Sequence, residues 1–140
     1  MDRNVALTLT GCQRDPDGGE TVTELSAAAE YFERNGAIYI LYEERTEDGG
    51  TAKSRIKLKD NLLKVTRKGS VNTCMLFEAG REHMTEYSTP FGNLQMGIFT
   101  HSVESDHSDN ELTIVADYSL TADGAEISRC KLSIKIQGKI

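Results

Sequence analysis

Short turn signals recur along the whole chain, and they separate segments in which apolar and polar residues alternate. Nine such positions occur, and Asn35-Gly36, Asp48-Gly49 and Asp123-Gly124 are of the kind that tolerates the positive φ angles of tight hairpins. Between the later turns, every second residue over 112–120 and over 130–136 is apolar. This period of two is typical of half-buried antiparallel strands, so the sequence predicts about ten of them.

One segment carries a competing helical signal. Thr21-x-x-Glu24 resembles a capping box, and Leu25, Ala28 and Phe32 follow at helical spacing. Against this, Asn35-Gly36 stands between two aromatic and β-branched runs, which is a strong hairpin signal, and strand pairing overrides local propensity. We therefore expect a strand here.

A meander of so many hairpins must protect its edges, and closure into a barrel removes them. With 140 residues and 38% apolar content, the chain fits a single core. The expectation is an all-β fold, in which residues 1–140 form one closed antiparallel up-and-down β-barrel domain.

Residues on the expected strands also carry a family pattern. It comprises Gly11-x-Gln13, Tyr42-Glu43-Glu44, Ile56-Lys57, Arg67-x-Gly69, Met75-x-Phe77, Gly80, Tyr87-x-Thr89-Pro90-Phe91-Gly92-x-Leu94-x-Met96, Thr100, Tyr118-x-Leu120 and Leu132-x-Ile134-x-Ile136. The pattern resembles the YwiB-like family of bacterial β-barrel proteins, a domain of unknown function with a calycin-type barrel. The resemblance implies a barrel related in shape to lipocalins and fatty-acid-binding proteins, and it implies no activity. The Ala-rich segment 27–29 departs mildly from it.

Tight turns at the Asn35-Gly36, Asp48-Gly49 and Asp60-Asn61 positions predict strand registers. They pair Phe32 with Tyr39, Leu41 with Ile56 and Leu58 with Leu63 on the interior face, and they turn Ile38, Ile40 and Tyr42 outward. If Gly69 forms a bulge, Thr73, Met75 and Phe77 face inward; a two-residue loop would instead turn Cys74 and Leu76 inward. We favour the bulge because Met75 and Phe77 are larger apolar side chains to bury than Cys74 and Leu76.

The same registers place Glu43 and Arg67 in one interior row, with Ser54 between them. Buried charges need partners, so an interior ion pair is expected. It has two interpretations: a structural pair, or an anchor for a small amphipathic or anionic ligand inside the barrel. In the second, the ligand-binding residues are Glu43, Arg67, Met96, Thr100 and Tyr118.

A basic stretch offers a different hypothesis. Residues 53–68 have a net charge of +6, which leaves −12 for the rest of the chain. Lys53, Arg55, Lys57, Lys59 and Lys64 would form an outer surface for an acidic protein or RNA, or merely a solvated strand face. Nucleic acid is disfavoured by the net charge of −6 and by the lack of aromatic residues beside the cations other than Tyr42. The outward apolar stripe of Ile38, Ile40 and Tyr42 suggests a homodimer interface or a covering segment.

Catalytic signatures are missing: the sequence contains no G-x-S-x-G, P-loop or G-x-G-x-x-G motif. We expect no enzyme, no cofactor and no metal site, since His101, His107 and the nearby acids fit a polar hairpin loop better than a ligand set. The three cysteines are widely spaced, which favours reduced thiols and a cytoplasmic location. No apolar run approaches the roughly 20 residues needed to cross a bilayer, so we expect no membrane partner.

Overall fold

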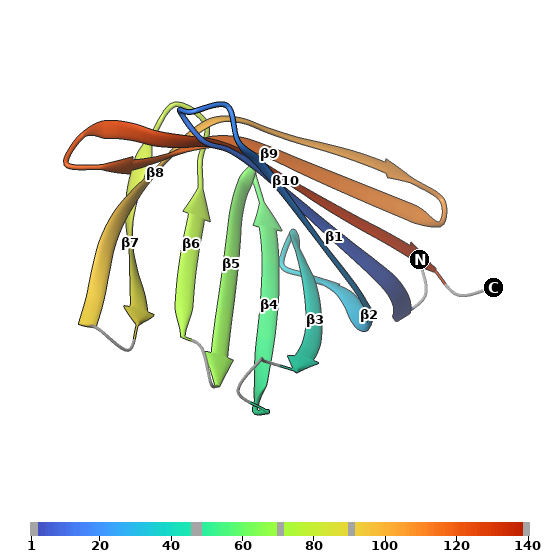
Figure 1. Ribbon diagram of the computed structural model, residues 1–140. Helices are drawn as coiled ribbons and strands as arrows, with labels where there is room; N and C mark the ends of the chain where they lie inside the picture. The colour runs from blue at the N-terminus through green and yellow to red at the C-terminus, as the bar shows by residue number, and fades with distance from the viewer. Residues whose placement is uncertain (1–2, 46–48, 70–71, 90–91, 139–140) are drawn as a thin grey trace.

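The computed structural model describes residues 3–45, 49–69, 72–89 and 92–138. Ten antiparallel strands follow one another along the chain: β1 (Asn4–Arg14), β2 (Glu20–Arg34), β3 (Ala37–Arg45), β4 (Thr51–Lys59), β5 (Leu62–Gly69), β6 (Thr73–Phe77), β7 (Glu82–Thr89), β8 (Gly92–Ser108), β9 (Glu111–Ala122) and β10 (Ala125–Gly138). They form one sheet in the order β6-β5-β4-β3-β2-β1-β10-β9-β8-β7. The sheet curls into a nearly closed barrel, with β6 and β7 meeting at the seam (Figure 1).

The segment with the helical signal is strand β2, as the hairpin argument predicts. Asn35 and Gly36 both have positive φ angles, of 53° and 77°, and they join β2 tightly to β3. Glu30 to Arg34 then pair with Leu41 to Ala37. The turn chemistry therefore decides the conformation over the capping-box pattern.

The β3–β4 register differs from the predicted one by a single residue. Ile40 pairs with Ile56, and Leu41 pairs with Arg55 instead of with Ile56. The last pair is Arg45 with Thr51, so an odd number of residues connects the strands, whereas a tight two-residue turn needs an even number. Because side chains alternate between faces, this slip turns all of β3, and β2 paired with it, to the opposite face.

The faces of β2 and β3 were therefore predicted wrongly. Phe32, Leu41 and Glu43 point outward, while the side chains of Tyr31, Ile40 and Tyr42 are buried inside. Pairing of Phe32 with Tyr39 and of Leu58 with Leu63 is confirmed. The predicted outward stripe of Ile38, Ile40 and Tyr42 belongs to the interior, so it provides no subunit interface.

The inward face of β6 is the one that the bulge hypothesis predicts. Gly69 has a positive φ of 133°, and Arg67 pairs with Thr73. Thr73 and Phe77 are buried, with Met75 packed against the core between them. The seam beyond β6 has a side-chain link, because the Thr85 hydroxyl donates to the Cys74 carbonyl at 2.8 Å.

Replacing Gly69 by Ala is expected to destabilise the barrel by more than about 2 kcal/mol. A Cβ there would lie 2.3 Å from the Thr51 carbonyl oxygen, in addition to the strain of a positive φ. Gly124→Ala is the matched control: its φ is also positive, at 80°, but a Cβ meets nothing within 4 Å, so only the strain of about 1 kcal/mol applies. Urea unfolding measures both, and equal losses would contradict the close approach of Gly69 to β4.

Candidate binding groove on the barrel wall

A row of polar side chains crosses the barrel interior from β3 to β6. Tyr42 pairs with Ser54, Ser54 with Arg67, and Arg67 with Thr73. Tyr42, Ser54 and Thr73 are all buried. The predicted interior position of Ser54 and Arg67 is correct, while the β3 member of the row is Tyr42 rather than Glu43.

The interior ion pair joins Arg67 to Glu44, whose side chain is only 15% exposed. Glu43 was the predicted partner, and it points outward beside Lys53 because of the one-residue slip. Breaking a largely buried pair leaves one charge without compensation, whereas an exposed acid is stabilised by water. The pair thus holds the end of β3 to β5 across β4.

The other predicted ligand-binding residues lie elsewhere in the barrel. Thr100 is fully buried and pairs with Tyr118, whose ring meets Phe77 edge-on with centroids 4.9 Å apart. Met96 packs against the same core. The structure therefore places Met96, Thr100 and Tyr118 in the interior as expected, with Glu43 on the other side of the barrel wall. A ligand inside the barrel stays a prediction.

The basic surface is confirmed as an outward face. Six cations of β4 and β5 share it and are called the basic face below: Lys53, Arg55, Lys57, Lys59, Lys64 and Lys68. Arg67, the remaining cation of residues 53–68, points inward to Glu44. Like charges stand opposite each other where Lys53 pairs with Lys68 and Lys57 with Lys64, which favours an anion between them.

Two aromatic rings that the sequence interpretation had turned inward lie beside this face. Phe32 and Tyr39 stack at 5.0 Å with an interplanar angle of 12°. The Lys57 ammonium lies 5.6 Å from the centre of the Tyr39 ring. Sequence reasoning missed both rings beside the cations, because it assumed an even-numbered β3–β4 turn.

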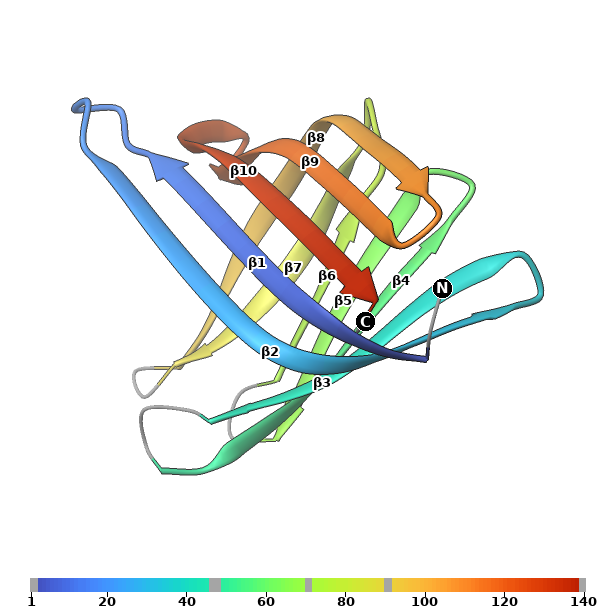
Figure 2. The same cartoon turned by 90° about the vertical axis from the view of Figure 1, so that its right-hand side faces the viewer.

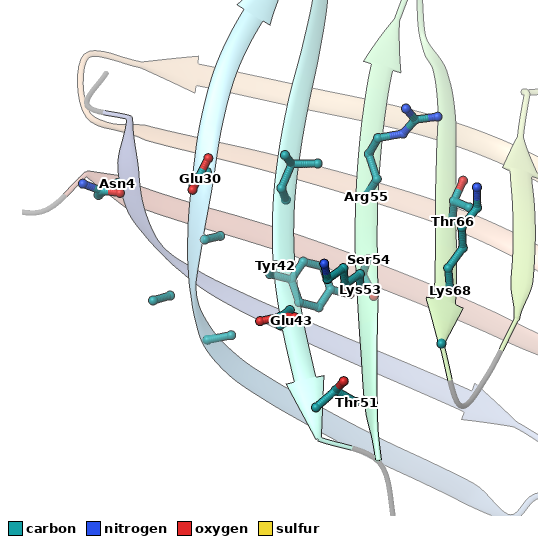
Figure 3. Close-up of a pocket in the computed structure, with 15 residues that line it drawn as sticks. Asn4, Glu30, Tyr42, Glu43, Thr51, Lys53, Ser54, Arg55, Thr66 and Lys68 are labelled. Atoms are coloured by element: carbon teal, nitrogen blue, oxygen red, sulfur yellow. The ribbon is translucent and has the colours of Figure 1, made fainter.

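A groove of about 1140 Å³ lies next to the basic face, over β2 to β5 (Figure 3). Its residues are of three kinds: cations, acids and small or apolar side chains. It is lined by Asn4, Ala27, Ala28, Ala29, Glu30, Leu41, Tyr42, Glu43, Thr51, Lys53, Ser54, Arg55, Thr66, Lys68 and Gly69.

The groove is charged at its rim and uncharged at its floor. Lys53, Arg55 and Lys68 are exposed, and they make no ion pair with any residue that the structure describes. Ala29, Tyr42 and Ser54 are buried. The groove therefore offers positive charge without an ion-pair partner beside small and apolar side chains, which suits an anionic and partly apolar occupant.

The histidines do not gather into a site. His101 Nε2 lies 2.8 Å from Ser119 Oγ, and His107 packs edge-on against Tyr31. Within the described ranges, no three His, Cys, Asp or Glu side chains are placed to hold a metal ion. Nor does that part of the chain contain a helix of the length and apolarity that crossing a membrane needs.

The model of the family described as "Domain of unknown function (DUF1934)" matches residues 7–134. This chain belongs to DUF1934. It is 24% identical over 124 residues to the uncharacterized beta-barrel protein YwiB of Bacillus subtilis (strain 168), a match that covers 89% of this chain and 87% of that protein.

A solved structure agrees with this assignment. The crystal structure of the ywiB protein from Bacillus subtilis superimposes with a TM-score of 0.86 at 22% identity, over 99% of this chain and 93% of that one. At this level of identity the likeness shows the fold alone. The DUF1934 chain is therefore a ten-stranded β-barrel protein of unknown function, and its groove has to be interpreted from its own residues.

Glu44→Gln is expected to lower the free energy of unfolding by about 1–3 kcal/mol, because it leaves the half-buried Arg67 guanidinium without its counter-charge. Glu43→Gln, the matched control one residue away, should change it by less than about 0.5 kcal/mol, since Glu43 is exposed. Denaturant titration of both variants gives the answer. A larger loss of unfolding free energy in Glu43→Gln than in Glu44→Gln would indicate that Glu43, as predicted from the sequence, is the partner of Arg67.

The interior tyrosines predict alkaline sensitivity. Burial raises the pKa of the Tyr42 hydroxyl above its ordinary 10.0, and burial together with a hydrogen bond to Glu33 raises the pKa of Tyr31 further. Both stay protonated in the folded chain at a pH where the unfolded chain loses those protons, so stability falls as the pH rises above about 10. Unfolding titrations between pH 8 and pH 11 should show a smaller fall in Tyr42→Phe. An unchanged pH dependence would contradict the raised pKa of Tyr42.

Proposed function

We propose that this protein is a non-catalytic binding protein whose groove receives an acidic, partly apolar polypeptide segment of a partner. One observation carries the proposal. Lys53, Arg55 and Lys68, which make no ion pair among the described residues, line a groove together with Ala27 to Ala29 and Leu41. An occupant that matches this lining carries both acidic and small apolar groups.

The charge distribution supports a polypeptide rather than RNA. Glu30 and Glu43 also line the groove, and they would repel the evenly spaced phosphates of a nucleic acid. Tyr39 lies between Phe32 on β2 and Lys57 on β4, so its ring is already in contact on both sides and is a poor platform for bases. A peptide can place neutral side chains beside the two acids and carboxylates beside the cations.

A small molecule inside the barrel is supported less well. Three residues assigned to that site are packed in or against the core, and the Arg67 guanidinium already has a carboxylate partner. The groove is also larger than most small-molecule sites, which occupy about 300–1,000 Å³. These features favour an extended polymer on the barrel wall.

The test uses a labelled decapeptide of alternating Asp and Val, with fluorescence anisotropy as the readout. Arg55→Glu should weaken its binding at least about tenfold, which corresponds to about 1.4 kcal/mol. Lys131→Glu is the matched control: Lys131 is exposed on β10, away from the groove, and its replacement should change affinity less than about twofold. Affinity should fall with added salt, since the contacts are exposed charges.

Three results would contradict the proposal. One is that the decapeptide does not bind, and another is that the two variants weaken binding equally. The third is tighter binding of a ten-nucleotide oligouridylate that Arg55→Glu abolishes, which would make RNA the partner. Native mass spectrometry of freshly purified protein adds an independent check: a carried-over small molecule that disappears in Thr100→Val would favour the barrel interior instead.

A further inference from the structure

Strand β2 has a free edge beside the groove. It pairs with β1 from Glu20 to Glu30, but it pairs with β3 only from Glu30 to Arg34. On the β3 side, residues 20–29 therefore have no strand partner in the described part of the chain. Figure 2 shows β2 continuing beside β1 while β3 turns away toward β4.

The phase of the β1–β2 ladder tells which backbone groups lie on this edge. The Tyr31 amide donates to the Arg3 carbonyl at 2.7 Å, so the backbone groups of Tyr31 point toward β1. Because the direction alternates along a strand, the N–H and C=O groups of Val22, Glu24, Ser26 and Ala28 point away from β1. They form a regular row of donors and acceptors that is open to another extended chain.

The groove begins where this edge ends. Ala27 to Glu30 of β2 line one side of it, and Leu41 to Glu43 of β3 line another. Residues 26–29 are Ser-Ala-Ala-Ala, so no large side chain stands in the way of a neighbouring backbone. Across β3, Lys53 and Arg55 are within the same groove. The space between the diverging strands is thus bordered by the unpaired backbone of β2 on one side and by β3 on the other, and Lys53 and Arg55 of β4 lie beyond β3.

Resting on the function proposed above, we infer that the acidic segment binds by β-strand addition: it pairs with the free edge of β2 and extends the sheet into the groove. Backbone hydrogen bonds to Val22, Glu24, Ser26 and Ala28 supply affinity, and alternate side chains supply specificity. On the outward face of the added strand, acidic side chains placed beside Ser26 and Ala28 extend across β3 toward Lys53 and Arg55. Small apolar side chains on its other face lie beside Leu25 and Ala27, which are partly buried against the core.

A second copy of this chain fits the edge less well. Glu20, Glu24 and Glu30 lie along β2, so two β2 strands would bring these acids together, whereas a separate segment can place neutral side chains beside them and carboxylates toward Lys53 and Arg55. A nucleic acid has no backbone amides with which to continue the ladder. The geometry therefore favours an acidic polypeptide over both.

The test is Ser26→Pro in the full chain, with the alternating Asp-Val decapeptide as the probe. Proline removes the Ser26 N–H, which points to the free edge, and leaves the bonds to β1 in place. Binding should weaken at least about tenfold, whereas Ser26→Ala, which keeps the N–H, should bind as the wild type does. Two N-methylated decapeptides, one methylated at the odd residues and one at the even residues, test the same hydrogen bonds on the wild-type protein without any change to its fold. One of the two peptides should fail to bind.

The outcomes separate this inference from the proposed function. If Arg55→Glu weakens binding while Ser26→Pro and both N-methylated peptides bind normally, strand addition is wrong and the groove proposal stands. If none of these changes matters, both are wrong. A dimer in light scattering that Ser26→Pro converts to a monomer, and that the decapeptide does not dissociate, would make a second copy the occupant of the edge and overturn the inference.

Discussion

Successive side chains of a β-strand point to opposite faces, so the β3–β4 register decides which residues of β2 and β3 lie inside this barrel. Every side chain of β2 and β3 takes its face from one pairing, that of Ile40 with Ile56. A shift by one residue would move Tyr31 and Ile40 into water and bring Glu43 into the core. The observed register buries Tyr31, Ile40 and Tyr42 and leaves the Glu43 carboxylate exposed to water.

The choice of register has an electrostatic consequence at each side of the wall. Inside, it brings Glu44 to Arg67, so the one cation of β5 that points inward has a counter-charge. Outside, it sets Phe32, Tyr39 and Leu41 beside the basic face. The chain is acidic overall, yet β4 and β5 present a concentrated positive surface with an apolar border. Such an asymmetric surface orients a charged partner before contact is made.

The wall is also incomplete at a specific place. The β2–β3 ladder stops at Glu30 and Leu41, and the groove lies where the two strands diverge. Three successive alanines at this point combine small volume with strand geometry, so the backbone of β2 stays accessible. The departure from the family pattern that the sequence shows at residues 27–29 thus coincides with the lining of the groove.

Local sequence determined much of this protein. Alternating apolar residues and turn chemistry predicted about ten strands, the β2–β3 hairpin at Asn35-Gly36 and the inward face of Thr73 and Phe77, because each depends on a few neighbouring residues. Arg67 was correctly placed inside, and the cations of residues 53–68 other than Arg67 on the surface. What the sequence could not determine was the face of β2 and β3, and with it Glu44, Tyr42 and the stacked rings. The face depends on whether an even or an odd number of residues connects β3 to β4. The local sequence is compatible with both numbers, and only the side chains that several strands bury together in the folded barrel decide between them.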